Sequence, residues 1–159
     1  MMSNEKTSFE DQSVFITGAA QGIGAATARI IAERGGKVFA FDIDAVGLRE
    51  LQKTLKLSDD QIIQIDVGSP ESVKESIELA YARSGRVDAL VNTVGIVGPN
   101  NTKVENVDWV DFERTFRINL FGATWGIRRG RRNVGLYGIQ GLFIYYWFPF
   151  DASGGRANY

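Results

Sequence analysis

The stretch Ser13-Val-Phe-Ile-Thr-Gly-Ala-Ala-Gln-Gly-Ile-Gly24 decides the fold. Residues 13–17 form a short apolar run of the kind that makes a buried strand, and three glycines follow it within seven residues. A helical pattern then continues as far as Gly35-Gly36, a typical helix end. Four residues carry that pattern: Ile23, Thr27, Ile30 and Ile31. A strand, a glycine turn and a helix in this order indicate an α/β protein.

The same alternation continues to about residue 125. Three more apolar runs predict buried strands at residues 37–41, 61–65 and 87–91. Three helical stripes accompany them: Leu48, Leu51 and Leu55; Val73, Ile77 and Ala80; Phe112, Phe116, Leu120 and Ala123. Strands that are apolar throughout and separated by helices predict a Rossmann-like doubly wound parallel sheet, truncated after the fourth or fifth strand. We expect an N-terminal tail at 1–11, a dinucleotide-binding domain at 12–125 and an atypical segment at 126–159.

Small or polar residues end all four predicted strands, and ligands of such sheets bind beyond these carboxyl ends. The residues are Thr17-Gly18, Asp42, Asp66-Val67 and Asn92. Asp66 could instead cap the next turn, and Asn92 could only satisfy backbone groups between strands.

The glycine loop is the strongest chemical signal. Backbone N–H groups between a strand and a helix N-terminus can hold a pyrophosphate. Gly18 permits the tight turn, Gly22 lets the backbone approach the phosphates, and Gly24 lets the helix pack closely. Asp42 follows Gly24 by eighteen residues, near the spacing that places a carboxylate on the adenosine ribose. Together these residues predict a dinucleotide site.

Composition excludes several classes of function. The chain has 159 residues with 18 Lys and Arg against 19 Asp and Glu, so no global charge points to nucleic acid or a membrane surface. It has no Cys and no His, which excludes a thiol nucleophile, a Cys/His zinc site and a Ser-His-Asp triad. We expect no metal site. The N-terminus lacks the apolar core of a signal peptide, and the apolar run 141–150 is too short to span a bilayer, so we expect a cytoplasmic protein.

The stretch Gly126 to Phe150 has a different character, with no acidic residue, four Arg between Arg128 and Arg132, and seven aromatic residues. Three interpretations stay open. It could be a basic–aromatic patch for RNA, an unusual folded fifth strand, or a segment out of register after a frame shift or a misjoined exon. The conflict between local and global patterns favours the third. That hypothesis predicts that the segment does not pack as a native strand and that it promotes aggregation.

The spacing Gly18-x-x-x-Gly22-x-Gly24 is similar to that of the short-chain dehydrogenase/reductase family. Asp66-Val67 matches the family's Asp on the adenine side of the cofactor. Asn92-Thr-Val-Gly95 resembles the family's Asn-Asn-Ala-Gly motif, with Thr93 and Val94 substituted. Residues 117–122 resemble the segment that carries the catalytic Asn, and residues 154–159 resemble the approach to the catalytic Tyr.

This resemblance implies hydride transfer between an alcohol and a carbonyl with NAD(P). It implies Asn119 and Tyr159 as catalytic residues, although Tyr159 could also be a frayed terminal aromatic. An Asn inside an apolar helix is costly without a polar task, which favours function for Asn119. The family's Lys would fall after Tyr159, and Tyr145-Tyr-Trp147 stands where its Ser belongs. We therefore expect a truncated chain without turnover. The alternative is a non-catalytic NAD-binding or interaction protein with the same fold.

The cofactor is expected to be NAD rather than NADP, because Asp42 would repel a 2′-phosphate and residues 19–21 offer no cation. The expected cofactor-binding residues are Thr17, Gly18, Gln21, Gly22, Ile23, Gly24, Asp42, Ile43, Asp66, Val67, Asn92 and Gly95. The expected partner of the intact enzyme is a small alcohol or ketone. Neither nucleic acid nor a membrane is expected, and a homo-oligomer is expected only of a full-length form.

Overall fold

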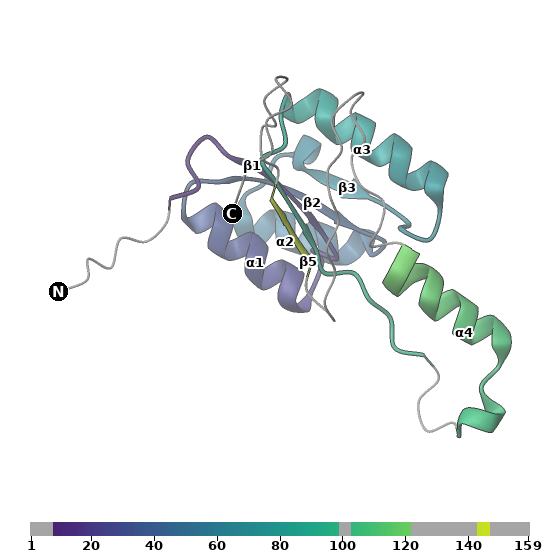
Figure 1. Cartoon of the computed structure of the whole chain (residues 1–159). Helices are drawn as coiled ribbons and strands as arrows, with labels where there is room; N and C mark the ends of the chain where they lie inside the picture. The colour runs from purple at the N-terminus through teal and green to yellow at the C-terminus, as the bar shows by residue number, and fades with distance from the viewer. Residues whose placement is uncertain (1–7, 99–102, 122–142, 147–159) are drawn as a thin grey trace, which may run out of the picture.

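One sheet organises the protein, seen in a computed structural model that describes residues 8–98, 103–121 and 143–146 (Figure 1). The strand order is β3-β2-β1-β4-β5. The strands are β1 (Ser13–Thr17), β2 (Lys37–Asp42), β3 (Ile62–Gln64), β4 (Ala89–Asn92) and β5 (Phe143–Tyr146). The helices are α1 (Gly22–Glu33), α2 (Ala45–Leu55), α3 (Pro70–Ser84) and α4 (Trp109–Phe116), with the 3-10 turns η1 (Asp59–Gln61) and η2 (Val104–Asn106) and the π-helix η3 (Arg117–Phe121). The strands β1 to β4 are parallel, as predicted.

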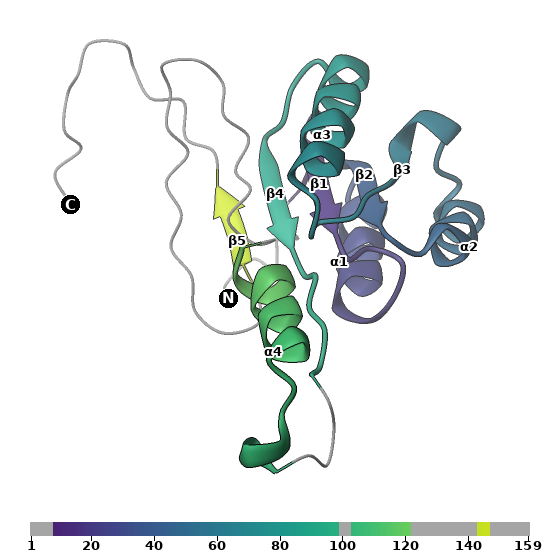
Figure 2. The same ribbon diagram turned by 90° about the vertical axis from the view of Figure 1, so that its right-hand side faces the viewer.

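Helices cover the two faces of the sheet, which confirms the doubly wound α/β fold (Figures 1 and 2). Side chains alternate along β1, so that Val14 and Ile16 face α1 and α2 while Phe15 faces α3. All three are fully buried. Because both faces are covered, the apolar character of the strands needs no alternation with polar residues.

The predicted helical stripe of α1 is only partly its buried face. Ile31 is buried, but Ile23 and Ile30 are 60% and 47% exposed. Gly24 and Ala28 take the inner positions instead, together with Ile31. Small residues there let α1 lie close to the strand ends. The face that α1 turns toward the sheet is therefore set by this close approach and not by its largest apolar side chains.

The third predicted strand is shorter than residues 61–65. Its first residue belongs to η1, and β3 has only three residues. The Gln61 side chain donates through Nε2 to the Val38 carbonyl at 2.7 Å. Beside the start of β3, this carbonyl of β2 is therefore bonded to a side chain and not to the backbone of a neighbouring strand. The fourth predicted strand likewise begins later, at Ala89.

The strand β5 corrects the expectation for residues 126–150. Phe143–Tyr146 pairs with β4 in antiparallel register, from Ala89 opposite Tyr146 to Asn92 opposite Phe143. The prediction that this segment does not pack as a native strand is therefore wrong for these four residues, which form the unusual fifth strand of the second interpretation, because the open edge of β4 offers backbone partners to an extended segment. The reversed direction departs from an all-parallel sheet. Residues 126–142 and 147–159 lie outside the described residues.

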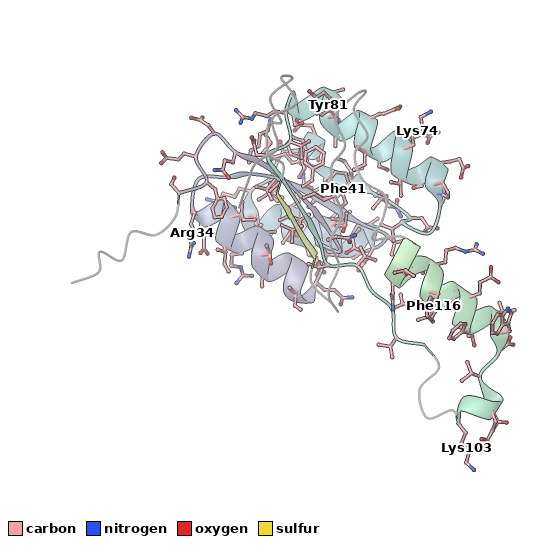
Figure 3. All side chains as sticks on the ribbon, viewed as in Figure 1. Arg34, Phe41, Lys74, Tyr81, Lys103 and Phe116 are labelled. Atoms are coloured by element: carbon pink, nitrogen blue, oxygen red, sulfur yellow. The ribbon has the colours of Figure 1, made fainter. Side chains whose placement is uncertain are left out.

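The helix α4 lies beside the carboxyl end of the sheet and extends away from it (Figures 1 and 3). Its aromatic residues Trp109, Phe112 and Phe116 stay exposed. Ile118 of η3, just after α4, packs against the cluster on the α3 side of the sheet. The predicted stripe of this helix is therefore exposed along Phe112, Phe116 and Leu120, while Ala123 lies outside the described residues. Across the described ranges, no helix has the length and apolar character that crossing a membrane requires.

Candidate functional site

The site predicted from the strand ends lies where the strand order changes direction. The chain moves from β1 outward to β2 and β3, then returns to place β4 on the other side of β1. The carboxyl ends of β1 and β4 are in register, with Thr17 opposite Asn92. A crevice opens at such a point in doubly wound sheets, because the connections leave in opposite directions.

Each of the three loop positions needs glycine for a different physical reason. Gly18 has a φ of +71°, and a Cβ there would lie 2.9 Å from Thr93. Gly22 has a φ of +57°, but a Cβ there would meet nothing within 4 Å. Gly24 has no room at all, since its Cβ would lie 2.0 Å from the Gly18 carbonyl oxygen. The tight turn, the open approach and the close packing were each predicted for the matching glycine.

The first turn of α1 presents free donors. Gln21 is the N-cap residue and its side chain makes no capping hydrogen bond. Within the described part of the chain, the N–H groups of Gly22, Ile23 and Gly24 have no acceptor. No acidic side chain occupies that turn. Unpaired N–H groups at a helix N-terminus attract an anion, and the open space over Gly22 leaves room for one.

Asp42 is fixed beside this loop by two backbone groups. Its Oδ2 accepts from the Ala20 N–H at 2.9 Å and its Oδ1 accepts from the Asp44 N–H at 3.0 Å. The neighbouring Ala19 N–H donates to the Phe41 carbonyl at 3.1 Å, so β2 holds the loop at two consecutive residues. Ile43 follows with its side chain 64% exposed. A carboxylate and an apolar side chain therefore stand together at the end of β2.

Asp66 and Val67 lie after β3 and have separate tasks. The Asp66 carboxylate accepts from the Gly68 N–H at 2.8 Å, and its own N–H donates to Ser72 Oγ at 3.0 Å. Asp66 thus caps the turn into α3, which is the alternative considered for it, and its side chain stays exposed. Val67 is buried in the core on the α3 side, so only its backbone is available to a ligand.

The ends of β1 and β4 are joined by side chains. Thr17 Oγ1 donates to Asn92 Oδ1 at 2.5 Å, and the Val94 N–H reaches the same oxygen at 3.4 Å. Asn92 Oδ1 therefore accepts from one side-chain hydroxyl and one backbone N–H, whereas its alternative interpretation named backbone groups alone. Thr93 donates from Oγ1 to the Thr17 carbonyl at 2.7 Å. Sequence reasoning assigned Thr93 no role, although its departure from the family's Asn marked the position.

Asn119 lies in the π-helix η3, a form of helix that often occurs at functional sites. Its Oδ1 accepts from the Ile96 N–H at 2.8 Å and its Nδ2 donates to the Ile96 carbonyl at 2.9 Å. The amide thus fixes the chain after β4, close to Gly95, whose Cβ position lies 3.6 Å from Oδ1. The described contacts give Asn119 a positioning task. Tyr159, the other predicted catalytic residue, lies outside the described residues.

A cavity of about 310 Å³ lies elsewhere, between β3 and α3. Its lining includes Gln64, Ser76 and Arg83, and none of the predicted cofactor-binding residues. The convergence of strand ends, free N–H groups and a fixed carboxylate is the stronger guide to a site than this cavity.

A family model described as short chain dehydrogenase matches residues 12–134. An uncharacterized oxidoreductase of Bacillus subtilis (strain 168), YxnA, is 34% identical over 85% of this chain and 38% of its own length. The 7alpha-hydroxysteroid dehydrogenase of Bacteroides fragilis is 36% identical over 70% of this chain and 44% of its own length. The chain spans about half the length, or less, of these curated relatives.

Solved structures show the same likeness. A 3-ketoacyl-(acyl-carrier-protein) reductase from Brucella melitensis, complexed with NADH, superposes with a TM-score of 0.65 at 31% identity. The superposition covers 72% of this chain and 46% of that chain. A short chain dehydrogenase from Mycobacterium smegmatis gives a TM-score of 0.65 at 30% identity, covering 72% of this chain and 48% of the other.

Proposed function

This chain belongs to the short-chain dehydrogenase family, and from that premise we propose that it forms the NAD-binding portion of an oxidoreductase acting between alcohols and carbonyls. The family membership supports oxidoreductase chemistry and a small-molecule substrate. The NADH complex of the Brucella melitensis reductase supports a nicotinamide cofactor for this chain.

The described residues fit such a cofactor. The free N–H groups of Gly22, Ile23 and Gly24 would hold the pyrophosphate, because they combine unpaired donors with the positive end of α1. Ile43 offers an exposed apolar surface next to Asp42 for the adenine side. When bound, the dinucleotide supplies the nicotinamide that accepts or gives hydride. The chain's own residues bind and orient it.

One observation carries the preference for NAD over NADP: the Asp42 carboxylate is bonded to the loop's own Ala20 N–H at 2.9 Å. The carboxylate is therefore fixed next to the phosphate-binding turn. A 2′-phosphate would bring a second negative group to this place, and residues 19–21 carry no cation to compensate it. A ribose 2′-hydroxyl, in contrast, can donate a hydrogen bond to a carboxylate.

The test compares NADH and NADPH in fluorescence titrations of the wild-type protein, Asp42→Ala and Asp42→Asn. We expect the wild type to bind NADH about tenfold or more tightly than NADPH. NADPH lacks the 2′-hydroxyl that donates to the Asp42 carboxylate, and its 2′-phosphate is repelled by that carboxylate. Both variants narrow that ratio, and Asp42→Asn keeps an oxygen that can accept from Ala20. Asp59→Asn, an exposed change outside the loop, is the matched control. Tighter binding of NADPH by the wild type overturns the preference.

Turnover by the 159-residue chain alone is expected to be absent even where NAD binds. The family's acid/base is a Tyr whose pKa a nearby Lys lowers, and the match to the family model covers residues 12–134, ahead of Tyr159. Loss of a general acid/base costs about two to four orders of magnitude in rate. An assay of NAD reduction with secondary alcohols, run beside a chain extended by a family-like C-terminal half, tests this. Turnover by the unextended chain contradicts the expectation. Binding without turnover in both chains favours a non-catalytic NAD-binding protein.

A further inference from the structure

We propose that Thr93 is a positioning residue whose hydroxyl fixes the glycine loop in its binding conformation. Thr93 directly follows β4, while the loop follows β1, so the residue reaches the loop from the neighbouring strand. The effect on the loop stands on contacts within the protein. Its consequence for affinity rests on the proposed binding of NAD.

The hydrogen bonds of Thr93 converge on the first two residues of the loop. Its Oγ1 donates to the Thr17 carbonyl at 2.7 Å, and the Gly18 carbonyl oxygen lies 3.3 Å from the same atom. Its N–H also donates to the Thr17 carbonyl, at 3.1 Å. One hydroxyl has one proton, so the shorter contact is the main bond and the Gly18 carbonyl shares it weakly. Both backbone and side chain of Thr93 therefore hold the end of β1.

The same hydroxyl touches two of the three glycines. A Cβ built on Gly18 would lie 2.9 Å from Thr93 Oγ1, and one built on Gly24 would lie 2.6 Å from it. The oxygen thus occupies the small space between the start of the loop and the first turn of α1. Only glycine at both positions leaves that space for it.

The loop is consequently held from both sides. From β2 it receives the bonds of Ala19 to the Phe41 carbonyl and of Ala20 to Asp42. From β4 it receives Thr93, which within the described residues is the one side chain of that strand's end that bonds to loop carbonyls. The family pattern places Asn here, so this chain has a hydroxyl at a position where the family has an amide. The first free N–H group of α1, that of Gly22, lies only four residues after Gly18. The direction in which it points therefore depends on how Thr93 holds Thr17 and Gly18.

The experiment measures amide hydrogen exchange in the cofactor-free protein for Thr93→Val, Thr93→Ala and Thr93→Ser. Thr93→Val removes the hydroxyl and keeps the shape, and Thr93→Ala removes it without placing a methyl against a carbonyl. Thr93→Ser keeps the donor. Thr54→Val is the matched control, since Thr54 Oγ1 also donates to a backbone carbonyl, that of Glu50 on the exposed side of α2. The reporters are the Ala19 and Ala20 amides, compared with amides of residues 38–41 that report global unfolding.

We expect Ala19 and Ala20 to exchange about tenfold faster in Thr93→Val and Thr93→Ala relative to residues 38–41, as for loss of one partly buried hydrogen bond. Thr93→Ser and Thr54→Val should match the wild type. The Kd for NADH should rise about three- to tenfold in Thr93→Val and Thr93→Ala, the same variants whose loop amides exchange faster. Unchanged exchange in the hydroxyl-free variants, equal acceleration of residues 38–41, or failure of Thr93→Ser to restore protection overturns the proposal. If no variant binds NADH, the proposed function fails while the exchange result still decides the role of Thr93.

Discussion

Two groups of three aromatic residues show how burial, and not ring contact, distinguishes the two ends of this molecule. Phe15 lies 5.1 Å from Phe39 and 5.2 Å from Phe41 between ring centroids, and all three are fully buried. On α4, Phe112 lies 5.3 Å from Trp109 and 4.6 Å from Phe116. These rings are 41% to 74% exposed. Figure 3 shows Phe41 within the layers and Phe116 outside them. Although the ring spacings are similar, the difference in burial implies unequal contributions to stability.

The largest expected effect separates these groups directly. Phe39→Ala should lower the free energy of unfolding by about 3–5 kcal/mol, because it leaves a cavity in a close-packed interior. Phe112→Ala should change it by less than about 1 kcal/mol, since the ring is already partly in water. Urea denaturation followed by circular dichroism measures both. Equal losses would show that α4 unfolds as part of the core.

The glycine loop provides the next comparison, between two of its own residues. Gly24→Ala should cost about 3 kcal/mol, because the new Cβ meets the Gly18 carbonyl at 2.0 Å and the backbone must move. Gly22→Ala should cost about 1 kcal/mol, because only its positive φ opposes the substitution. Thermal unfolding of the two variants ranks them. The reverse order would mean that the loop relaxes around Gly24.

The N-caps of α2 and α4 test whether the two regions unfold together. The Asp44 carboxylate accepts from the Val46 and Gly47 N–H groups, and Asp108 accepts from the Val110 N–H at 2.9 Å. Asp44→Ala should lower global stability by about 1 kcal/mol. Asp108→Ala should leave the global transition unchanged and speed amide exchange only within α4, because that helix has few buried contacts with the sheet. A shift in the midpoint of global unfolding for Asp108→Ala would show that α4 unfolds together with the core.

The smallest expected effect concerns a surface charge. Hydrogen bonds from Gln52 and from Arg49 hold the pKa of Asp59 below its ordinary value. A depressed pKa gives stability that is present above the unfolded pKa of about 3.9 and is lost as the pH falls through the folded value. The free energy of unfolding of Asp59→Asn should therefore lie slightly below that of the wild type at pH 7, and the difference should shrink as the pH falls below the unfolded pKa. A difference that does not change with pH would exclude this ionisation as its cause.

The fold and the glycine loop could be predicted because their signals are local. Apolar runs and the spacing from Gly18 to Gly24 each act within a few residues. The contact of Asn119 with Ile96 could not be found in this way, because it joins positions 23 residues apart through an irregular π-helix. The rotation of α1 was equally hidden, since it follows from the approach of Gly24 to Gly18. The pairing of β5 depends on the free edge of β4, which a pattern within residues 143–146 does not reveal.

The position of β1 between β2 and β4 has a consequence for synthesis of the chain. One edge of β1 pairs with β2, which is complete at Asp42, but the other must wait for β4, which is complete at Asn92. At about 5–20 residues per second, the 50 residues between them take about 3–10 s to translate. During that time the backbone edge of Val14, Phe15 and Ile16 has no partner strand from its own chain. The nascent chain therefore exposes this backbone edge to other chains during one definable interval, which runs from the completion of its second strand to the completion of its fourth.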